Sequence, residues 1–243
     1  MFRALLFDLD GTLLSYDTDA FLQKYMELLA RRVSEFVDPS LFLRQLLRST
    51  EAMVRNLDPS KTNKDVFMED FFPGIGIPPE VLMPVFDDFY RKEFLSLKSL
   101  VRPVPLARPL VEQAVRSGLD VVIATNPVFP MVAIRERLRW GHLDDLSYRL
   151  VTSYEVMHYC KPNREYYEEV LSMIGRRPCE CLMIGNDVDE DLAAGAAGIR
   201  TYLVTDCLRG KQDGGKRPDF CGTFQDLADF LKQVLGMPVV SGR

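Results

Sequence analysis

The sequence predicts an α/β protein in which a parallel sheet is interrupted, after its first strand, by an all-helical insert. From residue 119 onward, short apolar runs alternate with helical segments, and repeated strand–helix order is typical of a parallel sheet. Residues 15–99 instead keep the three-four spacing of apolar residues that amphipathic helices have. The first apolar run, residues 4–7, therefore belongs with the strands that follow the insert.

The expected elements follow this division along the chain. Strands are expected at residues 4–7, 119–124, 148–152, 181–184 and 201–204. Helices of the insert are expected at 21–36, 39–54, 67–72 and 79–97, the third ending at Pro73-Gly74 and the fourth making its main turn from Pro84. Later helices are expected at 109–117, 129–139, 164–174, 189–197 and 224–235. We therefore expect a core of residues 1–14 and 100–243 and a helical cap of residues 15–99.

Composition excludes several classes of protein. The chain has 243 residues, of which 47% are apolar and 27% charged, as in an ordinary globular protein. A net charge of -5 gives no general attraction to nucleic acids or to anionic membranes. The first ten residues resemble neither a signal peptide nor a membrane helix. The five scattered cysteines fit a reducing, cytoplasmic setting and give no zinc pattern, and nothing indicates the oligomeric state.

Two aspartates, Asp8 and Asp10, follow the first apolar run and stand before Gly11 and Thr12. The carboxyl ends of parallel strands open onto the ligand crevice, and period-two geometry would point both side chains the same way if the strand continued. Two neighbouring carboxylates repel unless one is protonated or a cation lies between them. The pair could supply a nucleophile and an acid/base, bind a hard metal ion, or simply end a strand in a turn.

Three later segments carry candidate partners of this pair. Thr125 and Asn126 end the second expected strand, where a hydroxyl and an amide suit phosphate oxygens. Lys161 precedes a helix in a proline-bounded loop and could neutralise carboxylates and a phosphate in one pocket. Acids crowd residues 187–191, which follow a strand and open a helix. Helix capping explains part of this crowding, and a bound cation would relieve the repulsion.

The string Phe7-Asp8-Leu9-Asp10-Gly11-Thr12-Leu13 resembles the first motif of the haloacid dehalogenase superfamily, whose members are mostly Mg²⁺-dependent phosphohydrolases. The Thr-Asn, Lys-Pro and acid-rich strings resemble the second, third and fourth motifs. This resemblance implies a doubly wound parallel sheet, with the first strand between the second and fourth, and an all-helical cap. The cap is expected to close over the site and to select the substrate.

The resemblance also implies roles for the residues. Asp8 would be the nucleophile, Asp10 the acid and base, and Thr125, Asn126 and Lys161 would bind the phosphoryl group. The metal ligands would come from Asp8, Asp10, Asp187 and Asp191, with Mg²⁺ as the ion. Where many members have Gly-Asp, this chain has Gly185-Asn186. We favour Asp187 over Asn186 in that place, because a carboxylate binds Mg²⁺ better than an amide, and Asp191 is then a ligand or an anchor.

These expectations indicate a phosphatase that hydrolyses a small phosphate ester, and they leave two alternative functions open. A sugar-phosphate mutase of the same superfamily would use the same aspartyl-phosphate chemistry. A catalytically silent binding module would retain the fold, and the Gly185-Asn186 departure is the feature that points to it. The substrate is not encoded in any recognisable pattern of the insert. Its helix-spaced aromatic residues are expected to form core rather than to line a pocket.

Overall fold

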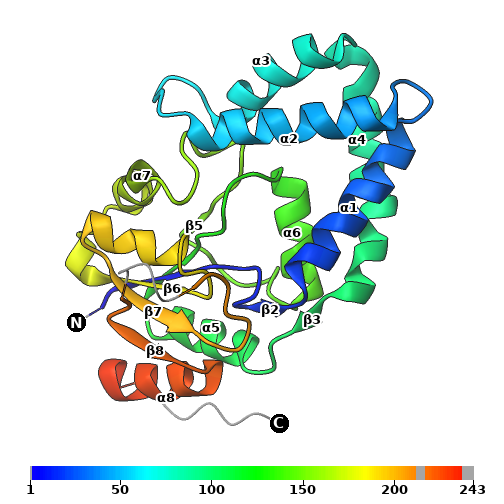
Figure 1. Ribbon diagram of the computed structural model, residues 1–243. Coiled ribbons are helices and arrows are strands. Elements are labelled where there is room, and N and C mark those ends of the chain that lie inside the picture. Colours follow the sequence, from blue (N-terminus) through cyan, green and yellow to red (C-terminus); the bar gives the residue numbers. More distant parts are fainter. Residues whose placement is uncertain (1, 212–216, 237–243) are drawn as a thin grey trace.

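The computed structural model describes residues 2–211 and 217–236 and contains one six-stranded parallel sheet in the order β5-β4-β1-β6-β7-β8 (Figure 1). Its strands are β1 (Ala4–Phe7), β4 (Asp120–Ile123), β5 (Leu150–Val151), β6 (Cys181–Gly185), β7 (Arg200–Val204) and β8 (Phe220–Gly222). β1 lies between β4 and β6, as predicted. The outer strand β8 was not expected from the sequence. The sheet is of the α/β, doubly wound type that the sequence predicts.

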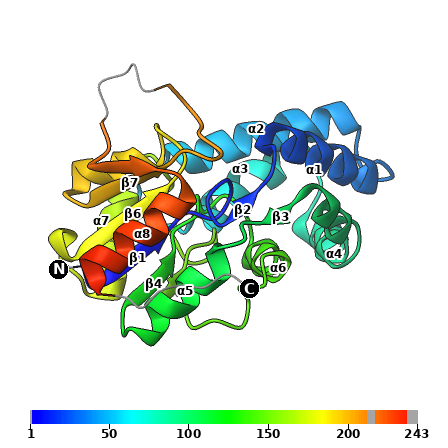
Figure 2. The same ribbon diagram turned by 90° about the horizontal axis from the view of Figure 1, so that it is seen from below.

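Every residue of β1 is buried, which shows that both faces of the sheet are covered at this strand. Leu5 and Phe7 belong to the hydrophobic cluster that contains α5 (Ala107–Arg116), α6 (Met131–Trp140) and α8 (Phe224–Leu235). Ala4 and Leu6 face the other way, into the cluster of α7 (Arg164–Ile174) and the 3₁₀ helix η3 (Asp191–Ala197). Figure 2 shows α5 and α8 on one side of the strands and α7 on the other. This alternation is the period-two geometry of a strand buried on both faces.

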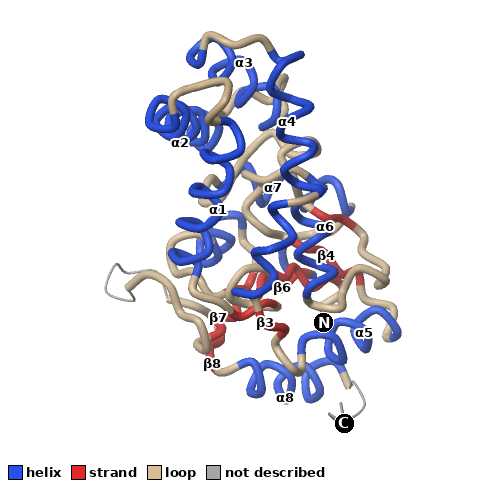
Figure 3. Tube along the Cα trace, turned by 90° about the vertical axis from the view of Figure 1, so that its right-hand side faces the viewer, coloured by secondary structure: helices blue, strands red, loops and turns tan. Residues whose placement is uncertain are grey.

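Residues 18–100 form a stack of helices at one end of the molecule, away from the sheet (Figure 3). These helices are α1 (Thr18–Val33), α2 (Pro39–Arg55), α3 (Asn63–Ile75), α4 (Pro79–Arg91) and the 3₁₀ helix η1 (Glu93–Leu100). The chain enters and leaves the stack through β2 (Leu14–Ser15) and β3 (Arg102–Pro103), which pair antiparallel. We propose that residues 15–99 are a cap and call them the cap below.

Two cap helices differ from the expectation. α3 continues through Pro73 to Ile75 and ends at Gly76, which has a φ of 71°. A Cβ on Gly74 would lie 2.3 Å from the Gln45 side chain, so this glycine permits close packing on α2 rather than ending the helix. α4 starts at Pro79 and contains Pro84, and the chain changes to 3₁₀ geometry after Arg91. The expected helix over 189–197 is likewise a 3₁₀ helix that begins at Asp191.

The cap also contacts the core far from β2 and β3, through the turn between α2 and α3. Asn56 Nδ2 donates to the His158 carbonyl at 3.3 Å, and Asn63 Nδ2 donates to the Tyr159 carbonyl at 3.1 Å. In the other direction, Asn163 Nδ2 donates to the Val54 carbonyl at 2.7 Å. We call these three hydrogen bonds the second tether. The second tether thus attaches the cap to the core at a place separate from β2 and β3 (Figure 1).

Candidate active site

The centre of the candidate site is a buried ion pair between Asp8 and Lys161. Asp8 directly follows β1, and its backbone N–H donates to the Ile184 carbonyl of β6 at 2.8 Å. Lys161 lies in the loop before α7 and is completely buried. Its Nζ lies 2.9 Å from Asp8 Oδ1 and 2.6 Å from Asp191 Oδ1. The structure thus brings together the predicted nucleophile, the predicted lysine and one predicted metal residue.

Burial and charge act against each other in this cluster. Burial raises the pKa of Asp8 well above its ordinary value, and the Lys161 ammonium counteracts that rise. Burial would lower the pKa of Lys161, but the carboxylates of Asp191 and Asp8 outweigh it and hold that pKa well above its ordinary value. Lys161 is therefore a permanent cation beside two carboxylates. A divalent cation bound nearby would further favour the ionised form of Asp8.

Asp10 lies in a turn rather than in the strand, because β1 ends at Phe7 and Gly11 takes a φ of 89°. Its Oδ2 accepts a hydrogen bond from Arg137 Nη1 of α6, and these two side chains form an ion pair. The Arg137 side chain is 1% exposed, and its guanidinium lies 4.6 Å from the centre of the Phe129 ring. Asp8 and Asp10 still line the same pocket, as predicted.

Sequence reasoning missed Arg137. The signal was a charged residue among the buried positions of α6, next to Leu138 and three residues after Ile134. A charge on the buried side of a helix needs a partner, and here the partner is Asp10. Tyr16 adjoins the same pair, and burial followed by the Asp10 charge raises the pKa of its hydroxyl well above the ordinary value. Tyr16 therefore stays protonated at neutral pH.

Thr125 and Asn126 follow β4 and line the same pocket. Asn126 Nδ2 donates to Glu190 Oε1 at 2.9 Å, and its buried Oδ1 has no hydrogen-bond partner among the described residues. Burial raises the pKa of Glu190 to about 7. The Thr125 carbonyl accepts from the hydroxyls of Thr152 and Tyr166, which fixes the backbone of this strand end.

Asn186 and Asp187, which are neighbours in the acid-rich segment, make different contacts. Asn186 is buried, donates to the Cys207 carbonyl at 2.6 Å and accepts from the Thr12 hydroxyl at 3.1 Å. Asp187 is partly exposed and lines the pocket, with its Oδ1 accepting from the backbone N–H groups of Asp189 and Glu190. Both residues line the pocket, but the Asn186 amide is bonded to Thr12 and Cys207 on either side, whereas Asp187 brings a carboxylate to the pocket.

Asp191 lies beneath these residues and is not among those that line the pocket. Its Oδ1 contacts Lys161, and its Oδ2 accepts from the Asp187 backbone N–H at 2.9 Å. Gly185 makes room for it, since a Cβ on Gly185 would lie 2.0 Å from Asp191 Oδ2. Both oxygens of Asp191 are thus engaged by the chain.

The pocket has a volume of about 140 Å³. Within the described residues, no three His, Cys, Asp or Glu side chains form a cluster that could hold a metal ion by themselves. Asp8 and Asp187 nevertheless offer carboxylate oxygens at this one pocket, which is the donor chemistry that Mg²⁺ prefers. Arg209 also lines the pocket, with its Nε 3.9 Å from Asp187 Oδ2. Residues 212–216 of the loop that starts at Arg209 lie outside the described residues.

The fold and this site define a class of protein, a doubly wound α/β protein with an acidic pocket at the carboxyl ends of its central strands. Residues 2–198 match the family model described as haloacid dehalogenase-like hydrolase. The chain belongs to this family. In addition, none of the helices in the described part of the chain has the length and apolarity to cross a membrane.

Several known proteins resemble the chain over most of its length. A phosphatase of Mycobacterium tuberculosis is 28% identical in an alignment of 206 positions that covers 83% of this chain and 86% of that protein. The glyceraldehyde 3-phosphate phosphatase of Methanothermobacter thermautotrophicus is 26% identical in an alignment of 251 positions that covers 97% of this chain and 100% of that protein. The solved L-2-haloacid dehalogenase of Xanthobacter autotrophicus shares the fold, with a TM-score of 0.56, 18% identity and coverage of 96% and 99% of the two chains.

Proposed function

We propose that the protein is a phosphatase that hydrolyses a phosphomonoester through an aspartyl-phosphate on Asp8. The observation that carries this proposal is the buried Asp8–Lys161 pair at the end of the central strand. Lys161 holds Oδ1 of Asp8 at 2.9 Å, and the proposal makes Oδ2 the attacking oxygen. The lysine charge offsets the repulsion between the carboxylate and an incoming phosphate. The phosphatases among the relatives support the phosphatase activity.

In the first step, Asp8 forms a bond to phosphorus while the bond between phosphorus and the ester oxygen breaks. We propose that Asp10 gives a proton to the leaving oxygen. In the second step, the Asp10 carboxylate takes a proton from water as that water attacks phosphorus, and the bond to Asp8 breaks. Free phosphate and the original Asp8 result. Arg137 positions the Asp10 carboxylate through their ion pair, so Arg137 is a positioning residue.

The transferring phosphoryl group is bound by Thr125, Asn126 and Lys161, which we propose as the phosphate site. The buried Asn126 Oδ1 lacks a partner, while its Nδ2 is held by Glu190. We propose that Asp8, Asp187 and the backbone carbonyl of Asp10 hold Mg²⁺, which would offset the negative charge of the phosphate and orient it. Asp191 anchors Lys161 and the Asp187 backbone instead of binding the ion.

The silent-module alternative depended on the replacement of a family aspartate by Asn186. Asn186 lines the pocket and is bonded to Thr12 and Cys207, and the adjacent Asp187 lines the same pocket, so the site still has a carboxylate in this segment. The observed arrangement therefore favours an enzyme over a binding module. The mutase alternative is separated by its product, because a mutase returns an isomerised sugar phosphate and little free phosphate.

The test is phosphate release from an aryl phosphate, with Mg²⁺ and with a chelator. Asp8→Asn should abolish release, and Asp229→Asn on the exposed side of α8 should leave it intact. Acid-quenched wild type should carry a phosphoryl-sized mass increase on the peptide that contains Asp8. Release that persists in Asp8→Asn, or a phosphoryl group trapped on another residue, would refute the mechanism.

A further inference from the structure

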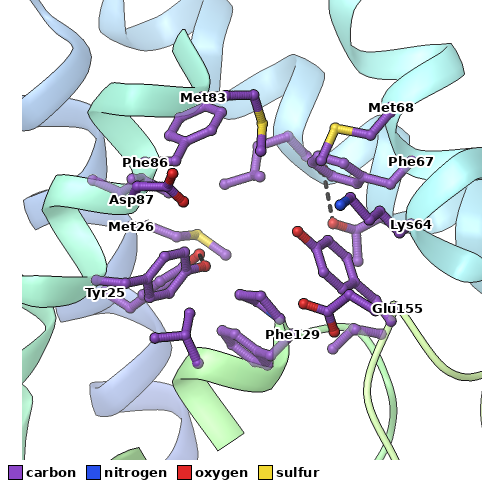
Figure 4. A pocket seen from close by; sticks show the side chains of 18 of the residues that line it. Tyr25, Met26, Lys64, Phe67, Met68, Met83, Phe86, Asp87, Phe129 and Glu155 are labelled. Atoms are coloured by element: carbon purple, nitrogen blue, oxygen red, sulfur yellow. Dashed lines mark hydrogen bonds between the residues drawn. The ribbon is translucent and has the colours of Figure 1, made fainter. Parts of the chain in front are cut away.

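A second cavity, far larger than the catalytic pocket, adjoins it on the side of the cap. Its volume is about 490 Å³, within the range of about 300–1,000 Å³ that small-molecule sites have. Helices α1 to α4 and the core segments 128–132 and 154–155 form its wall (Figure 4). Leu22, Val128 and Phe129 line both this cavity and the catalytic pocket, so the two spaces share a wall.

The wall of this cavity is mostly apolar and adaptable. Figure 4 shows Met26 of α1, Phe67 and Met68 of α3, and Met83 and Phe86 of α4 arranged around the open space. Thioether side chains are flexible and accommodate irregular shapes, and aromatic rings supply large contact areas. Such a wall favours an apolar ligand whose shape it can follow.

The few charged residues of the wall disfavour a second phosphate there. Lys64 is the cationic side chain on the wall, whereas Asp87 and Glu155 are acidic. The Glu155 carboxylate accepts from the Met131 backbone N–H and from the Ser153 hydroxyl, so it serves the start of α6. One cation against two acids gives the cavity no attraction for an anionic group.

We propose that this cavity receives the apolar part of the substrate, an alkyl or aryl group on the leaving oxygen of the phosphate ester. The inference rests on the proposed phosphatase function, since it places the phosphoryl group in the pocket of about 140 Å³. The ester oxygen then lies at the shared wall of Leu22 and Phe129, and the carbon skeleton extends away from Asp8 between the cap helices. The substrate class is a phosphomonoester with an extended apolar group and no second phosphate.

The experiment measures kcat/KM for phosphate release from n-alkyl phosphates, from methyl phosphate to long chains, with Mg²⁺. Burial of each added methylene should raise kcat/KM about fourfold until the cavity is full. A bisphosphate of similar size should be a poorer substrate than the alkyl ester. The same series of alkyl phosphonates, which are not hydrolysed, should stabilise the protein against heat increasingly with chain length.

A matched pair of variants locates the effect. Met68→Trp places a larger side chain in the cavity from α3 and should flatten the dependence on chain length. Met173→Trp makes the same change on the exposed side of α7, where the methionine is 43% exposed, and should keep the wild-type dependence. The ratio of long-chain to methyl phosphate rates is the quantity compared.

The outcomes separate the two proposals. If methyl and aryl phosphates are hydrolysed but rates do not depend on chain length, the cavity proposal is wrong and the phosphatase function stands. If no ester is hydrolysed, the phosphatase function is wrong, and phosphonate binding then decides about the cavity. Stabilisation that rises with chain length and is lost in Met68→Trp supports the cavity, and equal stabilisation by all phosphonates overturns it.

Discussion

Replacement of Lys161 by methionine should destabilise the protein severely, because it leaves two buried carboxylates without their cation. Lys161 is fully buried and lies 2.9 Å from Asp8 and 2.6 Å from Asp191. Methionine keeps most of the packing volume, so the loss comes from charge. Removing one partner of a buried ion pair costs about 3–5 kcal/mol. For a chain of this size that corresponds to a fall in Tm of about 6–20 °C.

The same reasoning fixes the pH dependence of the loss. Without Lys161, burial and the charges of Asp191 and Asp10 keep the folded-state pKa of Asp8 raised above the unfolded value. The folded variant then binds more protons than the unfolded chain between these two pKa values, and its stability falls as pH rises through that window. The deficit relative to wild type should be small near pH 4 and full at pH 8.

Thermal unfolding in chelator at several pH values measures this prediction. Lys232→Met on α8 is the control, since Lys232 pairs with the half-exposed Asp229 at 2.7 Å and such surface pairs are worth about 0–1 kcal/mol. Added Mg²⁺ should restore part of the stability of Lys161→Met by supplying a cation. A variant that unfolds within about 1 kcal/mol of wild type at pH 8 would refute the electrostatic account.

Other substitutions separate the roles of neighbouring residues. Asp187→Asn should raise the Mg²⁺ concentration for half-maximal phosphate release about tenfold or more. Asn186→Ala should leave that concentration unchanged but lower the unfolding free energy by about 1–3 kcal/mol, because the hydrogen-bond partners of Asn186 stay buried. Equal effects of the two variants on the Mg²⁺ concentration would contradict this division of roles. Gly185→Ala should cost about 1–3 kcal/mol in urea unfolding, since its Cβ would lie 2.0 Å from a carboxylate oxygen. Gly195→Ala, with nothing within 4 Å of the added carbon, should change stability by less than about 0.5 kcal/mol. Arg137→Met should lower kcat by about tenfold or more, and Arg137→Lys should recover part of it; full activity in Arg137→Met would contradict the positioning role.

The convergence of Asp8, Thr125, Lys161 and Asp187 could be predicted because it depends on local rules. Each residue follows a strand or precedes a helix, and parallel strands bring their carboxyl ends to one edge. The central place of β1 was expected from the family resemblance. The roles of these residues stay predictions until the substitutions above are measured.

The partner of Asp10 and the larger cavity could not be predicted, because both depend on tertiary packing. Arg137 would be solvated on a surface helix, and only the packing of α6 under the cap buries it. Among the cap aromatics, Phe71 and Phe89 are fully buried as expected, whereas Phe67 and Phe86 lie at the edge of the core and line the cavity. Helical spacing gives all four the same pattern, so only the mutual placement of α2, α3 and α4 distinguishes them.

We expect the second tether to restrict motion of the cap. A cap joined to the core at β2 and β3 alone could rotate about that connection, but the hydrogen bonds of Asn56, Asn63 and Asn163 hold its opposite edge. We therefore propose that a ligand enters through bending within the cap rather than through rotation of the whole cap. Asn163→Ala should remove one hydrogen bond of the second tether and speed product release. Stopped-flow measurement of the burst and steady-state phases of phosphate release would detect this change. Unchanged rates would mean that motion of the cap does not limit turnover.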